Sequence, residues 1–589
     1  MIIIGIYDDH NCSAALSIDG KIVFAAQEER FTGQKNEVGF PVNVVDHIFS
    51  AFNLTADMVD EMAFATIDRS DFVELKYKRD IRFRVKDHWE YMDEYWTPRL
   101  AGEPYDKRYV ENKLKEFASE SFYTFGDDLY DLEGEALKLR VNEIVADDIF
   151  KRYGLGKNKI VFYDHHTCHV TYGLFSNPNP NKESIVVTID AFGDGRNQTV
   201  WKYANNKLEI LAESKECELA RVYRFATLAM GMQPLEHEYK VMGLAPYAKE
   251  EYVENVYREL VRLTEVKDMS FRHLDRPKNL FNFLREKFRH YRFDNIAGGV
   301  QLYIERSVAE LFKDIHNHTG ISDFVFSGGV AMNIKANFTL VQEDFVDSLF
   351  VCGSSSDESL SIGACYLANY EKDIDNKPLD TLYLGDDLTT GEVEAYVASH
   401  GLDKRYNVSR VNNKAIARIL ADGEVVARVD GRMEFGARSL GNRSILADPS
   451  QPGVVKVINE MIKNRDFWMP FAATVMDRDC DKYLYNPKNV DGRYMSMAFQ
   501  AKHENIHEVF SGTHPYDETM RPQILTEQQN AKYYDLINEF SNLTGIGALL
   551  NTSLNLHGLP LARSIKDAIY VFENSGLKYL VVADYMISK

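Results

Sequence analysis

Two histidines with the spacing of a metal site stand in the segment Tyr163–Leu174, which reads YDHHTCHVTYGL and follows an apolar run. If this segment is helical, His165 and His169 lie side by side on one face. Two neutral imidazoles at this separation can bind one transition metal, and Asp190, at the end of the strand-like run SIVVTID, could add a carboxylate. The same spacing is also common in histidines that only pack or face solvent, so the motif alone leaves both interpretations open.

Three further segments carry polar residues beside glycines or at the ends of predicted strands. Asp190 and Asp194 flank a Gly-containing turn, which is ordinary turn chemistry but also a place for metal or phosphate. In DFVFSGGVAMN, a strand leads through Gly328 and Gly329 to a predicted helix, whose free amides favour a phosphate or nucleotide. Asp357 precedes another helix and could be a metal ligand or an N-cap.

Basic residues gather beside glycines in the C-terminal part of the chain. The segment GRMEFGARSLGNRSILADP holds Arg432, Arg438 and Arg443 with little opposing acid, and guanidinium groups at flexible turns suit phosphate or carboxylate. Later segments add Lys463, Arg465, His514, Asp517, Thr519, Arg521, Gln523, Asn551, Ser553 and Asn555. We therefore predict an anion-binding site in this region.

Two other basic stretches are interleaved with aromatic residues. They are KYKRDIRFRVK, residues 76–86, and REKFRHYRF, residues 285–293. Charge for phosphates and flat faces for bases are what a polyanion-binding surface needs. A solvated strand or helix face gives the same pattern, so this interpretation also stays open.

The elements that must position these residues can be read from the apolar pattern. Residues 1–7, 13–20 and 21–30 predict three antiparallel strands with a turn at Asp19 and Gly20, which is also how actin-like nucleotide-binding folds begin. Asn177 and Pro178 would end the histidine helix. An acidic, turn-rich run near residues 371–389 predicts a linker, and a helix over 392–400 and a buried strand over 424–429 follow it.

Size and composition limit the classes of protein to consider. A chain of 589 residues is expected to form two large domains or three smaller ones. The net charge of -21 excludes a protein that is basic overall but allows a local anion site. The six cysteines are scattered, and we find neither a signal peptide nor a membrane-spanning run, so a cytoplasmic protein without a membrane partner is predicted.

An ordered series of segments resembles the NodU/CmcH/TobZ family of O-carbamoyltransferases. These segments are HNCSAAL, AAQEERFTGQKNEVGFP, DHHTCH, EYKVMGLAPY, SGGVAMN, FGARSLGNRSILADP, IKNRDFWMPFA, THPYDETMRPQ and NTSLNLHGLP. The resemblance implies an α/β protein with an actin-like (ASKHA) domain over 1–370, a linker over 371–388 and a YrdC-like α/β domain over 389–589. It fades over residues 71–147, which we therefore expect to be an atypical insertion.

The resemblance also implies a reaction and a set of site residues. A YrdC-like domain would form carbamoyl adenylate from carbamoyl phosphate and ATP with Mg²⁺, and the actin-like domain would pass the carbamoyl group to a hydroxyl with the help of a divalent metal, with iron the usual ion. The implied metal ligands are His165, His169, Asp190 and Asp357, and the implied catalytic residues are His10, Lys35 and Asp190. The implied residues for nucleotide and carbamoyl phosphate are Ser327, Gly328, Gly329, Asn333, Arg438, Arg443, Lys463, Arg465, His514, Arg521, Asn551 and Ser553.

The acceptor and the alternatives to this activity remain open at this point. A small hydroxylated metabolite is the expected acceptor, and the basic, aromatic stretches allow a hydroxymethylated base in DNA; a homodimer is a further expectation. This chain has Asn11, Asn36, Ala437 and Ser439 where the family has other residues, which puts a carboxylate role at position 11 in doubt. A metal-dependent hydrolase would need a glutamate base that HHTCH lacks, and a non-catalytic nucleotide-binding partner is the third class.

Overall fold

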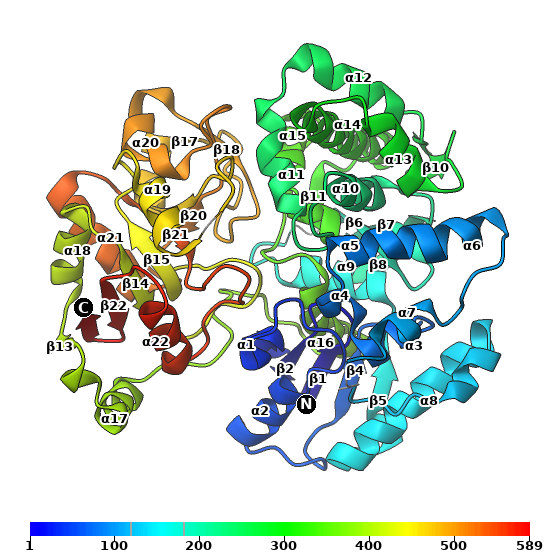
Figure 1. Ribbon diagram of the computed structural model, residues 1–589, viewed down its shortest axis with the longest axis horizontal. Helices are drawn as coiled ribbons and strands as arrows, with labels where there is room; N and C mark the ends of the chain where they lie inside the picture. The colour runs from blue at the N-terminus through cyan, green and yellow to red at the C-terminus, as the bar shows by residue number, and fades with distance from the viewer. Residues whose placement is uncertain (118–120, 181–182, 464) are drawn as a thin grey trace. The chain divides into compact units, whose positions relative to one another are not determined.

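The computed structural model describes residues 1–117, 121–180, 183–463 and 465–589 (Figure 1). The chain forms two compact units: Met1–Thr32 with Asn36–Leu379, and Gly33–Lys35 with Asp380–Lys589. The change of unit at residue 379 falls inside the segment predicted as a linker. Within the described ranges, none of the helices combines the length and the hydropathy that a bilayer crossing requires. All six cysteines are described, and each is a free thiol.

The first sheet of the first unit has the strand order β3-β2-β1-β4-β5. Its strands are β1 (Ile2–Tyr7), β2 (Ser13–Ile18), β3 (Lys21–Gln27), β4 (Glu61–Phe64) and β5 (Ile160–Phe162). The first three strands are antiparallel, whereas β4 runs parallel to β1, and β5 runs parallel to β4. Asp19 and Gly20 both have positive φ, at 48° and 81°, which is the twist that a tight hairpin needs. The three predicted strands and their turn are therefore confirmed.

The second sheet of this unit repeats the topology of the first, in the order β12-β11-β6-β7-β8. Its strands are β6 (Glu183–Gly193), β7 (Arg196–Ala204), β8 (Lys207–Ser214), β11 (Asp323–Ser327) and β12 (Ser348–Phe350). Again three consecutive strands are antiparallel, and two later strands add in parallel beside the first. Two sheets with this shared order form the actin-like arrangement, so the predicted α/β fold class is confirmed.

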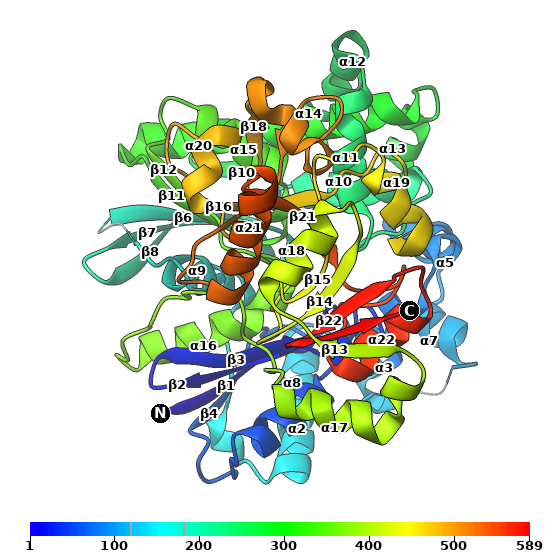
Figure 2. The ribbon, with the colours of Figure 1, turned by 90° about the vertical axis from the view of Figure 1, so that its left-hand side faces the viewer.

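Two helices lie between these sheets, α9 (His165–Phe175) and α16 (Leu360–Glu371) (Figure 2). Helix α16 packs on β1, β2 and β4, helix α9 packs on β6, β7 and β11, and the helices pack on each other. Glycines allow the close approach: a Cβ at Gly5 would lie 1.9 Å from the Ser361 carbonyl oxygen, and one at Gly363 would lie 2.1 Å from that of Cys168. The backbones of β1, α16 and α9 are therefore in direct contact.

Further helices and one hairpin cover the outside of the first unit. Helix α2 (Val42–Ala51) packs on β2 and β3, and α10 (Leu219–Ala229) packs on β6. The others are α11 (Glu238–Leu244), α12 (Glu250–Leu260), α13 (Leu280–Phe288), α14 (Phe293–Thr319) and α15 (Ile334–Gln342), with the hairpin β9 (Thr264–Lys267) and β10 (Ser270–His273). The longest of these helices is α14.

Residues 71–147, where the resemblance fades, form a series of mostly short helices. These are α3 (Phe72–Tyr77), α4 (Arg79–Arg82), α5 (Val85–Tyr91), α6 (Thr97–Ala101), α7 (Tyr109–Leu114) and the start of α8 (Gly134–Tyr153). Phe83, Tyr91, Tyr109, Val110 and Leu114 form a small core of their own. The segment is therefore a packed helical insertion, and residues 118–120 within it lie outside the described part.

The second unit is built on a mixed sheet of order β13-β23-β22-β14-β15-β21-β16-β20. The strands are β13 (Asn407–Arg410), β14 (Val426–Val429), β15 (Arg443–Ala447), β16 (Ala472–Met476), β20 (Gln523–Leu525), β21 (Ala548–Ser553), β22 (Tyr579–Val582) and β23 (Tyr585–Ser588). A smaller sheet joins β17 (Leu484–Tyr485), β18 (Phe499–Ala501) and β19 (Thr519–Met520). The predicted strand over 424–429 is β14.

Helices accompany both faces of the large sheet. They are α17 (Thr390–His400), α18 (Asn413–Ala421), α19 (Val454–Ile458), α20 (Cys480–Tyr483), α21 (Ala531–Thr544) and α22 (Ile565–Glu573). Ala427 and Val429 belong to the apolar core on the α22 side, whereas the Arg428 guanidinium lies 5.4 Å from the centre of the Tyr533 ring of α21. Because neighbouring strand residues point to opposite faces, this alternation puts a buried charge on one face and the core on the other.

Candidate metal centre and anion site

The start of helix α9 is fixed by two aspartates. Asp164 is the N-cap, and its carboxylate accepts a hydrogen bond from the Thr167 amide at 2.8 Å. The Asp194 carboxylate accepts the His165 amide at 2.7 Å and also the amides of Ile67 and Asp68. The sequence left open whether Asp194 holds a ligand, and the structure gives it this anchoring contact.

Helix α9 brings His165 and His169 together with Asp190 and Asp357. The His169 Nε2 atom lies 3.2 Å from Asp190 Oδ2 and 3.2 Å from Asp357 Oδ1, and His165 Nε2 lies 3.8 Å from Asp357 Oδ1. One ligand atom from each of the four residues lies within 4.8 Å of all the others, and all four side chains are buried. Asp190 reaches this group because the pairing of β6 with β7 is irregular between Ile189 and Gly193.

The donor set fits a metal ion. His165 Nε2 is buried and has no hydrogen-bond partner among the described residues, which is costly unless a ligand satisfies it. Burial alone would lower the pKa of His169, but hydrogen bonds to Asp190 and Asp357 raise it to about 9. Negative charge therefore exceeds positive charge here, as expected for a cation site. Two imidazoles and two carboxylates suit several divalent metals, so the set does not select iron.

The two carboxylates are held by contacts outside the group. The Tyr7 hydroxyl donates to Asp357 Oδ2 at 2.8 Å, and the Gly329 amide donates to Asp190 Oδ2 at 2.7 Å. Such partners orient ligands and tune a metal. No side-chain cap bond from Asp357 is found at the start of α16 among the described residues, so its alternative role as an N-cap is not the one seen. Tyr7 was missed in the sequence, where its only signal is its place at the end of the first strand.

The glycine pair of SGGVAMN packs against the strand that carries Asp190. Gly328 has a φ of +90°, and a Cβ there would lie 2.5 Å from the Ile189 carbonyl oxygen, so only glycine fits beside β6. A 3₁₀ turn over Gly329–Met332 follows, and helix α15 starts later than the predicted position. Asn333 is its N-cap and accepts the Ala336 amide at 3.1 Å. Gly329 and Asn333 thus have structural contacts, and the nucleotide role predicted for them remains a prediction; Ser327 is buried beside them.

Replacing Gly363 with alanine should weaken metal binding by moving α9. The added Cβ would meet the Cys168 backbone, so the two helices must separate and change the distance from His169 to Asp357. Overpacking of this kind costs about 1–3 kcal/mol of unfolding free energy. Metal content by emission spectroscopy and the melting temperature should both fall. Gly391→Ala is the matched control because its Cβ would meet open space, and unchanged metal content in Gly363→Ala would refute this account of the packing.

His10 lies at the edge of the metal centre. Its Nε2 atom is 3.4 Å from Asp357 Oδ2, and its Nδ1 atom is 3.9 Å from Asp9 Oδ1. Burial alone would lower the pKa of His10, but Asp9 and Asp357 raise it to about 10. Negative charge therefore exceeds positive charge around His10, as it does around His169. Lys35, predicted to act with His10, belongs to the second compact unit, whereas His10 and the four candidate ligands belong to the first.

A buried lysine that makes no ion pair within the described part of the chain marks the second unit. Lys463 is 3% exposed, and its ammonium donates to the carbonyl oxygens of Ser553 and Asn555, to Ser553 Oγ and to Asn555 Oδ1. All four acceptors are neutral, and among the described residues it makes no ion pair. Burial lowers the pKa of Lys463 strongly, and the positive charges of Arg465 and Lys35 lower it further. Three cations therefore lie near one another, which favours an anionic ligand.

The other residues predicted for this site have different surroundings. The carboxylate of Glu434 accepts the amides of Leu440, Asn442 and Arg443 and so shapes the arginine-rich loop. Arg443 is 1% exposed, and its guanidinium donates to backbone carbonyls, including those of Asp430, Gly431 and Arg563. Arg443 thus has structural contacts, and the phosphate role predicted for it remains a prediction. The sequence could not reveal these contacts because the partners are backbone atoms.

The remaining predicted residues are spread over several loops. Asn551 donates to Thr474 Oγ1 at 3.1 Å and accepts from Ser439 Oγ at 3.1 Å, so it braces the centre of the sheet. His514 is buried, with Nδ1 3.3 Å from Asp517. Arg438 and Arg521 are half-buried, and the Arg465 guanidinium lies 4.9 Å from the centre of the Phe471 ring. Lys463 bonds to Ser553, and the charges of Lys35 and Arg465 act on it, so these four residues form the candidate anion site. The roles predicted for the other residues remain predictions.

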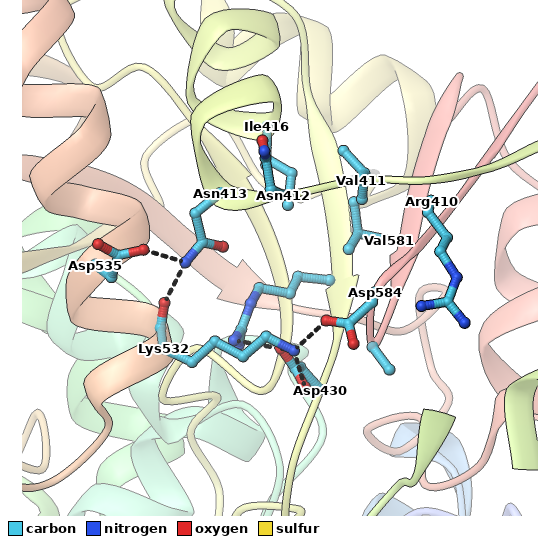
Figure 3. A pocket seen from close by; sticks show the side chains of 12 residues that line it. Arg410, Val411, Asn412, Asn413, Ile416, Asp430, Lys532, Asp535, Val581 and Asp584 are labelled. Atoms are coloured by element: carbon cyan, nitrogen blue, oxygen red, sulfur yellow. Dashed lines mark hydrogen bonds and ion pairs between the residues drawn. The ribbon is translucent and has the colours of Figure 1, made fainter. Parts of the chain in front are cut away.

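A separate cavity of about 520 Å³ opens in the second unit (Figure 3). Lys532 crosses it between Asp430, at 2.9 Å, and Asp584, at 2.8 Å. Arg428, which also lines the cavity, is 2.8 Å from Asp430. These cations are already neutralised, and none of the predicted site residues lines the cavity. The cavity therefore does not add to the candidate anion site.

Fold and site together place the chain among two-unit α/β proteins with a buried His₂Asp₂ group in an actin-like half. The family model described as "Carbamoyltransferase N-terminus" matches residues 2–366, and the model described as "Carbamoyltransferase C-terminus" matches residues 417–589. The chain belongs to the carbamoyltransferase family, as the ordered segments predicted. Membership of this family makes a transferase the expected enzyme and disfavours the hydrolase and the non-catalytic partner.

Several proteins of known sequence are similar to this chain. The uncharacterized protein MJ1051 of Methanocaldococcus jannaschii is 28% identical and is matched over 100% of both chains. Nodulation protein NolNO of Sinorhizobium fredii is 29% identical over 73% of this chain and 64% of its own length. Nodulation protein U of the same species is 30% identical over 45% of this chain and 46% of its own.

Solved structures resemble the chain only weakly. The structure of HypF from T. kodakarensis has a TM-score of 0.31 and 11% sequence identity, and the match covers 63% of this chain and 48% of that one. Component A of the (R)-2-hydroxyglutaryl-CoA dehydratase of Acidaminococcus fermentans also has a TM-score of 0.31, with 13% identity, over 63% of this chain and 98% of that one. Scores at this level support no conclusion about the site.

Proposed function

We propose that this protein is an ATP-dependent O-carbamoyltransferase with a small hydroxylated molecule as acceptor. The observation that carries the proposal is the buried group of His165, His169, Asp190 and Asp357, in a chain of the carbamoyltransferase family. Within the described part of the chain, one imidazole nitrogen of this group has no hydrogen-bond partner. The cation group around Lys463 in the second unit supports a second site for anionic co-substrates. Two separate sites fit a reaction in two stages.

The first stage would take place in the second unit. Water removes the phosphate of carbamoyl phosphate; a carbamate oxygen then bonds to the α-phosphorus of ATP, and pyrophosphate leaves, giving carbamoyl adenylate. Lys463, Arg465 and Lys35 would offset the negative charge of these molecules, with Mg²⁺ on the ATP phosphates. The neutral oxygens of Ser553 and Asn555 hold the Lys463 ammonium in place without neutralising it, so its charge remains available to a phosphate group.

The second stage would take place in the first unit. His165, His169, Asp190 and Asp357 would hold a divalent metal, which supplies a Lewis acid that polarises a carbonyl group and lowers the pKa of a hydroxyl group. The acceptor oxygen bonds to the carbamoyl carbon, the bond from that carbon to the phosphate oxygen breaks, and AMP leaves. The hydroxyl proton is lost to solvent, and His10, the imidazole beside the centre, would contact the acceptor oxygen. Burial of the four side chains excludes water from them.

A hydroxymethylated base in DNA is the less favoured acceptor. Four cations of the stretch over residues 76–86 are paired with carboxylates: Lys76 with Asp127, Lys78 with Glu37, Arg79 with Glu74 and Asp80, and Lys86 with Glu90. In the second stretch, Arg285 is 2.9 Å from Asp93. Cations that are neutralised within the protein release few counterions from DNA. A small acceptor does not require a basic surface.

The experiment that tests the proposal measures pyrophosphate from ATP and carbamoyl phosphate together with a panel of acceptors. The panel includes sugars, nucleosides and DNA that contains hydroxymethylcytosine, and each member is analysed by mass spectrometry for one added carbamoyl group. We expect pyrophosphate release and transfer to a small hydroxylated member. Treating the enzyme with a chelator and restoring Mg²⁺ before the assay should stop transfer but not pyrophosphate release, because only the second stage uses the His₂Asp₂ group. The absence of pyrophosphate with every acceptor would refute the proposal.

A further inference from the structure

The helical insertion reaches the edge of the metal centre through Asp80, a residue of α4. One ligand atom from each of Asp9, His10 and Asp80 lies within 4.8 Å of the other two. His10 in turn has Nε2 3.4 Å from Asp357, one of the four candidate metal ligands. Asp80 therefore adds a carboxylate beside the histidine that borders the centre, from the basic, aromatic stretch over residues 76–86.

Asp80 is held firmly by a buried arginine. Arg79 is 6% exposed, and its Nε and Nη2 atoms both donate to Asp80 Oδ1, at 3.1 and 2.7 Å. The same guanidinium bonds to Glu74 and lies 5.1 Å from the centre of the Tyr91 ring. Among the described residues, no hydrogen bond occupies Asp80 Oδ2. One oxygen thus fixes the carboxylate through Arg79, and the carboxylate as a whole lies beside Asp9 and His10.

The insertion is attached to the elements around the metal centre at several points. The Tyr123 hydroxyl donates to Asp8 Oδ2 at 2.5 Å, and Lys78 donates to Glu37 at 2.8 Å. On the other side, the Trp89 indole donates to the Leu228 carbonyl of α10 at 3.2 Å. These contacts join the insertion to the loop after β1 and to α10. The position of Asp80 relative to His10 is therefore set by the packing of the whole insertion.

The side chains around His10 restrict the orientation of its imidazole ring. Asp357 approaches Nε2, Asp9 lies near Nδ1, and the Tyr7 ring meets the imidazole edge to face with centroids 6.2 Å apart. Asp9 is half exposed, so on its own it offers a loosely held partner. Asp80, which Arg79 fixes, is the rigid carboxylate of the pair, and a carboxylate beside an imidazole sets the ring orientation.

We propose that Asp80 is a positioning residue that fixes the His10 imidazole for contact with the acceptor hydroxyl. This inference rests on the proposed function and adds to it that the insertion contributes to the acceptor side of the transfer site.

A double-mutant cycle tests this role. Wild type, Asp80→Asn, His10→Gln and the double variant are compared for pyrophosphate release, for metal content and for kcat and KM of carbamoyl transfer. Ammonia release, which reports transfer to water, is measured alongside transfer to the acceptor. Removal of a partner that orients an active group costs about 10–100-fold, so Asp80→Asn should lower kcat for transfer by this factor. The double variant should transfer no more slowly than His10→Gln, because Asp80 acts through His10.

Two further variants keep the test independent of folding. Asp80→Glu should recover part of the lost rate, since it restores a carboxylate. Asp93→Asn removes another carboxylate of the insertion, one that pairs with Arg285, and should behave like wild type. Multiplicative losses in the double variant, or loss of metal from Asp80→Asn, would overturn the inference while the wild type still transfers carbamoyl groups. A wild type that releases no pyrophosphate would overturn the proposed function, and the inference with it.

Discussion

Replacing His165 with alanine should abolish carbamoyl transfer while pyrophosphate release from ATP and carbamoyl phosphate continues. Removal of a side chain that only orients a metal ligand already costs about 10–100-fold in affinity or activity, so loss of a ligand should cost at least about 100-fold. The His165 Nε2 atom has no hydrogen-bond partner among the described residues. Its removal therefore breaks no bond of that nitrogen, and the loss of activity should exceed the loss of stability.

The measurement is metal per chain, by emission spectroscopy, with transfer and pyrophosphate assayed on the same sample. His166→Asn is the matched control on the same helix: His166 Nδ1 contacts Thr188 Oγ1 at 2.8 Å, a contact that an amide can keep, and His166 is not among the four candidate ligands. The control should retain its metal. If His165→Ala keeps full metal content and full transfer activity, the proposed assignment of the metal ligands is refuted.

Replacing Lys463 with methionine should stop pyrophosphate release, the stage that the replacement of His165 leaves intact. Removal of one donor that stabilises developing negative charge costs about 10²–10³-fold in other enzymes, and Lys463 is the most buried of the three cations. Metal content of the first unit should not change, because the four ligands belong to that unit. The two variants together should separate the two stages of the reaction.

The stability of Lys463→Met should depend on pH in a definite direction. Burial and the charges of Arg465 and Lys35 hold the pKa of Lys463 well below its ordinary value, so above this lowered pKa the folded protein binds fewer protons than the unfolded chain. Stability of the wild type therefore gains from rising pH until the ordinary lysine pKa of about 10.4 is reached. The variant lacks this gain, so its melting temperature relative to wild type should fall as pH rises. Lys456→Met, at an exposed lysine nearby, should show no such trend, and a flat difference for Lys463→Met would contradict the lowered pKa.

Elements with strong local signals could be predicted from the sequence. Strands β1, β2 and β3 and their turn follow from apolar runs interrupted by Asp19 and Gly20. Helix α9 follows from Asp164, which caps it, and from the proline after Asn177, which it cannot pass. These signals are local, because each depends on the conformations of a few neighbouring residues.

The metal group could be proposed from the sequence only in part. His165 and His169 share a helix face, so their spacing alone brings them together. Asp190 and Asp357 come from a different strand end and from a loop more than 160 residues later, and their approach depends on the packing of α9 between α16 and the second sheet. Their assignment therefore came from the resemblance, and the geometry now places all four together.

Other contacts could not be predicted because the sequence does not name the partners of polar groups. Arg443 and Arg438 look alike beside their glycines, yet the first is enclosed by carbonyl oxygens. Gly329 was predicted to offer its amide to a phosphate, and the amide instead bonds to Asp190. Asp80 stands in a charged, aromatic segment without clear periodicity, and only the folded insertion brings it to His10.

The long separation of the contacting residues also has a consequence for synthesis of the chain. The Tyr7 hydroxyl bonds to Asp357, 350 residues later, and His169 meets the same carboxylate across 188 residues. Neither contact can form on a ribosome before residues 357–371, including α16, have emerged, and contacts of such high sequence separation form late in folding. Metal loading must therefore follow translation of the whole first unit, and a nascent or truncated chain that ends before Asp357 should be unable to acquire the metal.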